Sequence, residues 1–213
     1  MQQHADSTRY PKIVTLADHY WSAALKQPGI QQWVLQTLRA VPENLYFHYN
    51  LLHNKGCISI TKFLYYQVAD AIDKGRVTLK IVPSLAIKKF HAVYYPKINT
   101  IMLPVNITTM PGLLIHEATH AALDLRKRSL RKVQSESIAY IAQHMHKNLS
   151  GRPSRLRSGY HAAAHAVASR VLATNRRARM ISLMDDDVMK LALEIEDGEY
   201  GRKASYQMTT ADG

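Results

Sequence analysis

Apolar residues recur at helical spacing along much of the chain, and glycine or proline separates several of these periodic segments. A period of about 3.6 residues indicates amphipathic helices, and the breaks indicate where one helix ends and the next begins. We therefore expect a helix-rich structure. Helices are predicted at residues 14–26, 30–41, 60–74, 113–125, 135–143, 159–174 and 185–196.

Three shorter segments have the composition and alternation of half-buried strands. They are residues 77–82, 91–95 and 100–103, and residues 96–99 suit a hairpin connection between the last two. The sequence thus predicts the α+β class, with a small mixed sheet and an antiparallel hairpin packed on the helix at 113–125.

The length of the chain suits one domain with a substantial core. We expect this domain to cover residues 1–197, with a helical N-terminal part at 1–76 and the hairpin and remaining helices at 77–197. Residues 198–213 are polar and lack periodicity, which predicts a flexible tail.

The helix at 113–125 contains the sequence His-Glu-Ala-Thr-His at positions 116–120. Residues i and i+4 share a helix face, so His116 and His120 can bind one ion. Zinc accepts imidazole nitrogen, and Glu117 beside the first histidine can take a proton from water. The pattern predicts one Zn²⁺ ion with Glu117 as general base. The alternative is a buried apolar helix whose two histidines are satisfied by hydrogen bonds.

Two histidines do not complete a zinc site, and Glu136 is the best candidate for the third protein ligand. It is the only acid between Asp124 and Asp185. We expect Ser135 to cap the helix that carries it, and that helix to run back antiparallel and bring its first turn over the metal. The alternative is a first-turn carboxylate that interacts favourably with the helix dipole.

His-Glu-Ala-Thr-His followed by Ser-Glu-Ser-Ile-Ala-Tyr-Ile-Ala-Gln resembles the gluzincin class of zinc metallopeptidases, to which thermolysin belongs. The resemblance covers about residues 91–145 and extends to compact bacterial and phage zincin-like domains. It implies a zincin-like fold, metal ligands at His116, His120 and Glu136, and a general base at Glu117. It also implies that an extended substrate lies beside a sheet edge above the metal helix.

A second histidine pair lies in residues 160–168, which resemble the metal helix of membrane-anchored ATP-dependent bacterial metalloproteases. Ala162 stands where that family has its glutamate base, so His161 and His165 do not form a second catalytic motif. They are core or surface residues, ligands of another metal, or contributors near the zinc. His161 and Tyr140 are candidate catalytic donors to the oxyanion, and the rival donors are Tyr94, Tyr95 and Tyr160.

Positive charge is concentrated in residues 126–179, which contain thirteen Lys and Arg but a single acid, Glu136. The whole chain has a formal net charge of +12. This basic region suits an anionic partner, such as nucleic acid, an anionic membrane surface or an acidic protein. The alternative is a solvated face. Aromatic residues are not interleaved with the charges, which disfavours single-strand binding.

Cys57 is the only cysteine, so a reducing compartment is expected. The N-terminus lacks the apolar core of a signal peptide, and no run approaches a membrane span. We expect a cytoplasmic protein, or one secreted without a signal peptide as a delivered effector. The predicted reaction is hydrolysis of a protein or peptide substrate. The alternative is a non-catalytic zincin-like scaffold that binds an anionic partner, and the oligomeric state stays open.

Overall fold

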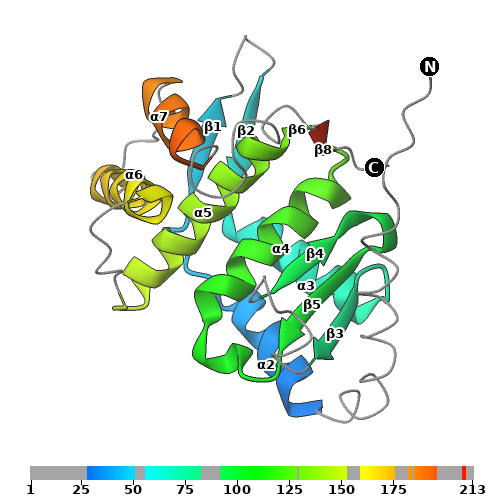
Figure 1. Ribbon diagram of the computed structural model, residues 1–213. Coiled ribbons are helices and arrows are strands. Elements are labelled where there is room, and N and C mark those ends of the chain that lie inside the picture. Colours follow the sequence, from blue (N-terminus) through cyan, green and yellow to red (C-terminus); the bar gives the residue numbers. More distant parts are fainter. Residues whose placement is uncertain are drawn as a thin grey trace, which may run out of the picture.

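The computed structural model describes residues 28–50, 56–82, 92–128, 130–152, 159–175, 182–183, 185–195 and 208–209. The helix predicted at 14–26 lies outside these ranges. Six α-helices and eight short strands form the described part of the chain, which confirms the α+β class (Figure 1).

Helices and short strands alternate along the chain without a regular repeat. From the N-terminal end they are α2 (Pro28–Arg39), β1 (Phe47–Asn50), β2 (Cys57–Ile60), α3 (Lys62–Asp73), β3 (Thr78–Val82), β4 (Val93–Tyr95), β5 (Thr100–Pro104), α4 (Pro111–Leu125), β6 (Leu130–Arg131), α5 (Lys132–Leu149), α6 (Gly159–Asn175), β7 (Ser182–Leu183), α7 (Asp185–Ile195) and β8 (Met208–Thr209). The predicted helices and strands within the described ranges are all present, with bounds that shift by a few residues.

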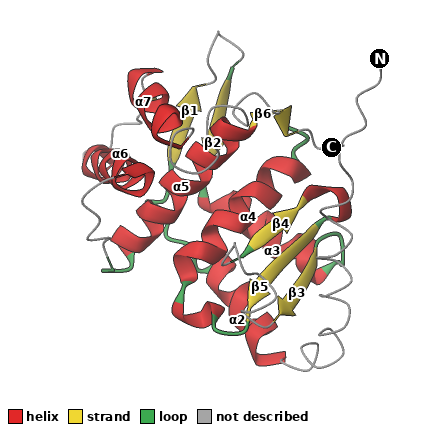
Figure 2. Cartoon of the chain, viewed as in Figure 1, coloured by secondary structure: helices red, strands yellow, loops and turns green. Residues whose placement is uncertain are grey.

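A mixed sheet of order β3-β5-β4 lies beside α4 (Figure 2). Strand β3 runs parallel to β5, and β4 pairs antiparallel with β5, which places Tyr94 opposite Ile101. The expected hairpin connection is a 3₁₀ turn at Pro96–Ile98. It ends at Asn99, whose φ of 44° is left-handed, a conformation that asparagine tolerates better than most residues. The predicted hairpin and its mixed sheet are therefore confirmed.

A second sheet of order β2-β1-β7 was not predicted from the sequence. It includes two strands within the N-terminal part that was expected to be helical. Phe47 and Tyr49 of β1 are buried while His48 and Asn50 are partly exposed, which is the alternation of a half-buried strand. Each of β1 and β2 has only four residues, too few for their periodicity to stand out from the neighbouring loops.

Helices α4 and α5 pack side by side at the centre of the described structure (Figure 1). The sheet β3-β5-β4 and helix α3 contact α4, and helices α6 and α7 contact α5. Gly112 allows a close approach near the start of α4, because a Cβ atom there would lie 3.0 Å from Lys147 Cε on α5. The pair is thus enclosed on several sides, and polar side chains between them are removed from water.

The start of α5 differs from the prediction. Ser135 was expected to be the N-cap, but α5 begins at Lys132 and Arg131 is the N-cap. The Arg131 backbone N–H donates a hydrogen bond to Gln134 Oε1 at 3.0 Å. The glutamine side chain therefore supplies the acceptor for the backbone N–H of the N-cap residue. As a result, Glu136 lies in the second turn of α5 rather than in its first turn. The helix dipole is therefore a weaker reason for a carboxylate at this position.

Part of the expected tail forms a strand. Residues 208–209 form β8, which pairs antiparallel with β6 so that Leu130 lies opposite Thr209. The rest of residues 198–213 lies outside the described ranges. This pairing places two residues of the C-terminal segment beside the link between α4 and α5.

Helix α3 holds α4 through a buried hydrogen bond, which generates the first testable prediction. The Tyr65 and Thr119 hydroxyls are 3.0 Å apart, and Thr119 also donates to the Ile115 carbonyl at 2.7 Å. Because the Thr119 hydroxyl donates its proton to the Ile115 carbonyl, the Tyr65 hydroxyl is the donor in the hydrogen bond between Tyr65 and Thr119. Tyr65→Phe should lower the free energy of unfolding by about 1 kcal/mol.

Denaturant unfolding measures this change, and Tyr66→Phe is the matched control. Tyr66 follows Tyr65 on α3 but is half exposed, so its replacement should leave the stability close to that of the wild type. Equal stability of the two variants would contradict a contribution from the buried hydroxyl.

Candidate metal centre

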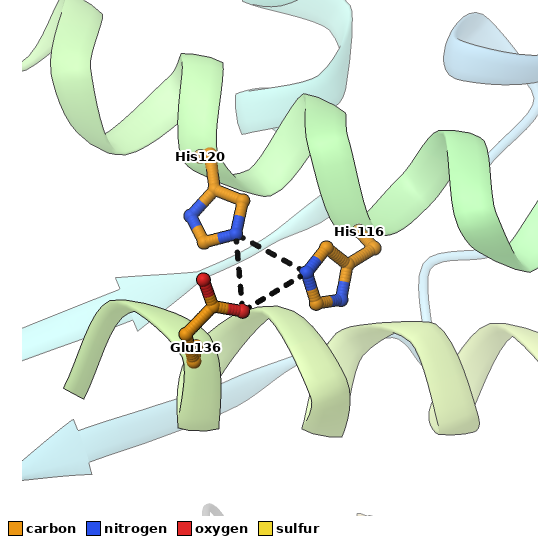
Figure 3. A group of neighbouring side chains, drawn as sticks. All are labelled: His116, His120 and Glu136. Atoms are coloured by element: carbon orange, nitrogen blue, oxygen red, sulfur yellow. Dashed lines mark hydrogen bonds and ion pairs between the residues drawn. The ribbon is translucent and has the colours of Figure 1, made fainter. Parts of the chain in front are cut away.

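Helix α4 directs two imidazoles toward α5, and Glu136 on α5 points back at both (Figure 3). His116 Nε2 and His120 Nε2 are 3.2 Å apart. Glu136 Oε2 lies 3.2 Å from His116 Nε2 and 3.6 Å from His120 Nε2. The structure therefore brings together all three residues that the sequence proposed as metal ligands.

The spacing of these three atoms is close to that of a tetrahedral site. Ligands at about 2.0–2.1 Å from a tetrahedral ion are about 3.3–3.4 Å from one another. The observed separations of 3.2, 3.2 and 3.6 Å bracket this value. Two imidazole nitrogens and a carboxylate oxygen are also a donor set that zinc accepts. The buried group of His116, His120 and Glu136 can thus hold a metal ion.

Ser135 orients His120 from the side away from the cluster. Its Oγ lies 2.8 Å from His120 Nδ1. An imidazole whose Nδ1 carries the proton toward such a partner keeps the lone pair of Nε2 free for an ion. The sequence predicted Ser135 as an N-cap, which was wrong. Its position next to Glu136 in the sequence was the signal that could have indicated its contact with a proposed metal ligand. His116 differs, because its Nδ1 is buried without a hydrogen-bond partner.

The charge of Glu136 is stabilised by the two histidines. Burial alone raises the pKa of Glu136, but the His120 charge and the hydrogen bonds from His116 and His120 outweigh it and hold the pKa well below its ordinary value. Glu136 is therefore a carboxylate in this environment. The deprotonated carboxylate is the form in which a glutamate binds a metal ion.

Glu117 is adjacent to the cluster but is held by a different element. Its Oε2 accepts a hydrogen bond from the Tyr94 backbone N–H at 2.7 Å, and Tyr94 belongs to the edge strand β4. Burial raises the pKa of Glu117, and the neighbouring histidine charges oppose this effect only in part. A carboxylate with a raised pKa accepts a proton more readily, as a general base must.

The candidate oxyanion donors differ in what their side chains contact. The Tyr94 hydroxyl lies 2.5 Å from Asp124 Oδ2 and 2.9 Å from Asn99 Oδ1, so it is engaged away from the cluster. The Tyr140 ring instead contacts His116, with 4.5 Å between ring centroids. The Tyr140 ring also contacts His161, with 4.9 Å between ring centroids. Tyr140 is therefore a candidate donor whose ring contacts a proposed metal ligand, and His161 packs against Tyr140.

The basic region is only partly described. Arg126, Lys127 and Arg128 follow the end of α4, while Arg131 and Lys132 lie at the start of α5. Five of the arginines lie outside the described ranges: Arg155, Arg157, Arg176, Arg177 and Arg179. Among the described helices, none combines the length and apolarity needed to cross a bilayer.

Comparisons with known proteins leave the family of this chain open. No protein-family model matches the sequence. Searches of curated proteins and of solved structures found no match to it either. Function must therefore be inferred from the side chains of the candidate metal centre.

Removal of the Ser135 hydroxyl tests whether it orients a metal ligand. Ser135→Ala should weaken the affinity for Zn²⁺ by about 10–100-fold, because His120 loses the partner that sets its tautomer and ring orientation. Competition with a chromophoric chelator measures the affinity.

Ser137→Ala is the matched control for this measurement. Ser137 lies two residues further along α5, is fully buried, and donates to the Val133 carbonyl at 2.8 Å rather than to a histidine. Its replacement should leave zinc affinity unchanged. A similar loss of affinity in both variants would indicate a general effect on α5 and would contradict a specific role for Ser135.

Proposed function

We propose that this chain is a zinc-dependent hydrolase that cleaves peptide or amide bonds, with His116, His120 and Glu136 as the metal ligands. The observation that carries the proposal is the convergence of their three ligand atoms at separations of 3.2–3.6 Å. A buried carboxylate that suits a general base, Glu117, adjoins them. Metal ligands and a base are the two parts that metal-assisted hydrolysis needs.

A bound zinc ion supplies a Lewis acid, which makes water more acidic and polarises a carbonyl group. Glu117 accepts the proton of the attacking water and delivers it to the leaving amine. The Tyr94 N–H holds one carboxylate oxygen, which orients Glu117 during this transfer. The burial of Glu117 excludes bulk water, so the proton moves to the leaving group rather than to solvent.

The substrate proposed for this site is an extended protein or peptide segment. Strand β4 is at the edge of its sheet and is connected to the site through the bond from Tyr94 to Glu117. Main-chain pairing with an exposed sheet edge is a recurrent mode of peptide recognition. Such pairing would place the scissile bond of the substrate near Glu117, because β4 would bind the substrate and also holds the Glu117 carboxylate.

Tyr140 is proposed to stabilise the oxyanion that develops on the substrate. It is the candidate donor whose ring contacts a metal ligand directly. His161 packs on Tyr140 and supports its position. A hydroxyl aimed at developing negative charge typically contributes about 10²–10³-fold to the rate.

Replacement of the base by its amide tests the proposal. Glu117→Gln retains the size of the side chain and an oxygen for the Tyr94 N–H, but it cannot accept a proton. Cleavage of a library of internally quenched peptides should slow by about 10²–10⁴-fold, while zinc content stays at the wild-type level. Glu136→Ala should lose both activity and the zinc ion of the candidate metal centre.

Glu43→Gln is the matched control, because its side chain is 86% exposed and lies on a loop outside the candidate metal centre. It should retain the wild-type cleavage rate. If Glu117→Gln also retained that rate, Glu117 would not be the base. A zinc-loaded wild type that cleaves no peptide would favour the non-catalytic scaffold instead.

A further inference from the structure

The short link that joins α4 to α5 is strongly basic. It contains Lys127, Arg128 and Arg131, and all three side chains are exposed. Among the residues that the structure describes, no acidic side chain forms an ion pair with any of them. The described part of the chain therefore leaves these charges without a neutralising partner.

The turn between β4 and β5 adds a fourth exposed cation, Lys97, at the same end of α4. The Tyr94 hydroxyl lies 2.5 Å from Asp124 Oδ2, near the end of α4, and 2.9 Å from Asn99 Oδ1, at the end of the turn. Figure 1 shows the connection between β4 and β5 at the same end of α4 as β6. We give the name basic cluster to Lys97, Lys127, Arg128 and Arg131.

Acidic side chains nearby do not cancel this charge. Residues 92–152 contain three acids, and Asp124 is the only one of them that is not buried. On α3, which also contacts α4, Asp70 and Asp73 form ion pairs with basic side chains. The electrostatic potential around the basic cluster is therefore positive, which attracts anionic groups.

An extended peptide that pairs with β4 would run past the basic cluster. Through Tyr94, β4 contacts both Glu117 and Asp124. These two acids are seven residues apart on α4, which corresponds to about 10 Å along the helix. An extended chain covers this distance in about three residues. Substrate residues about three to five positions from the scissile bond, on the side of the β4–β5 turn, would therefore lie beside the basic cluster.

We infer that the basic cluster is a substrate-recognition surface, which binds acidic side chains about three to five positions from the scissile bond. This inference rests on the proposed function, because the positions are counted from the proposed base. Exposed charges attract one another without a fixed geometry, so the cluster selects a run of Asp or Glu rather than one defined residue. The preferred substrate is an acidic protein segment in extended conformation.

Nucleic acid is the competing ligand for a basic surface, and the structure favours a peptide. The cations lie at one end of an edge strand, which pairs with a peptide main chain and not with bases. Residues 96–98 and 126–131 contain no aromatic side chain on which a base could stack. The acidic peptide is therefore the proposed occupant, and duplex DNA serves as a competing probe.

Fluorescence anisotropy with the full-length, zinc-loaded Glu117→Gln protein measures peptide binding without turnover. Labelled peptides of about ten residues carry a run of Glu, or the same run of Gln, near either end. The Glu peptide should bind about tenfold more tightly at low ionic strength, because opposite charges attract over the Debye length. Salt at about 1 M should remove most of this preference.

Charge reversal in this background locates the binding surface. Arg128→Glu should reduce the preference for the Glu peptide to about twofold or less, because repulsion replaces attraction. Lys97→Glu should also lower it, and this second variant changes a different element. Both side chains are exposed, so neither change should disturb the core.

Arg152→Glu is the matched control. Arg152 is also an exposed arginine, but it follows the opposite end of α5 from Arg131. That end, at Leu149, is thirteen residues from Glu136, or about 20 Å along the helix. Arg152→Glu changes the net charge by the same amount as Arg128→Glu and should retain the tenfold preference.

Two results would overturn the inference: equal affinity for the Glu and Gln peptides, or an equal loss of preference in Arg128→Glu and Arg152→Glu. Duplex DNA that binds more tightly than the Glu peptide, and is weakened by Arg128→Glu, would also refute it and assign the surface to nucleic acid. A failure of the proposed function looks different. If the wild type cleaves no peptide while a preference for Glu persists and depends on Arg128, the hydrolase is contradicted and the acidic-peptide surface is supported.

Discussion

A buried carboxylate between α4 and α5 is the constraint on which the rest of this structure depends. Glu136 is removed from water, and an isolated charge in such a place is strongly destabilising. It remains ionised because His116 and His120 contact it from the opposite helix. These contacts require α4 and α5 to meet at one register, since a shift of one residue on either helix would move the carboxylate away from both rings.

The surrounding elements maintain that register. Helix α3 holds the far face of α4 through Tyr65 and Thr119, and strand β4 holds Glu117 through its main chain. Ser135 orients His120 from within α5 itself. Each contact uses a buried polar group with a defined direction, so together they restrict the side chains more narrowly than apolar packing would. A site pre-organised in this way suits metal binding, because ligands that are already aligned lose little entropy when an ion binds.

Helix α5 serves two groups of polar side chains on different parts of its surface. One contains Glu136 and faces α4, and the other contains His144 and faces α6. Tyr140 lies between them and contacts both His116 and His161. A helix of this kind is buried nearly all round, which explains why its sequence mixes polar and apolar residues without the single apolar stripe of a surface helix.

The sequence by itself determined what depends on local geometry. Helical spacing placed His116 and His120 on one face of α4, because positions i and i+4 align in any helix. The scarcity of acids singled out Glu136, and alternation located the hairpin. Only the tertiary structure decided which side chains meet across helices. Ser135 contacts His120, and His144 joins His161 and His165, because of how α4, α5 and α6 pack. Packing of that kind follows from burial summed over the whole core, which no short segment encodes.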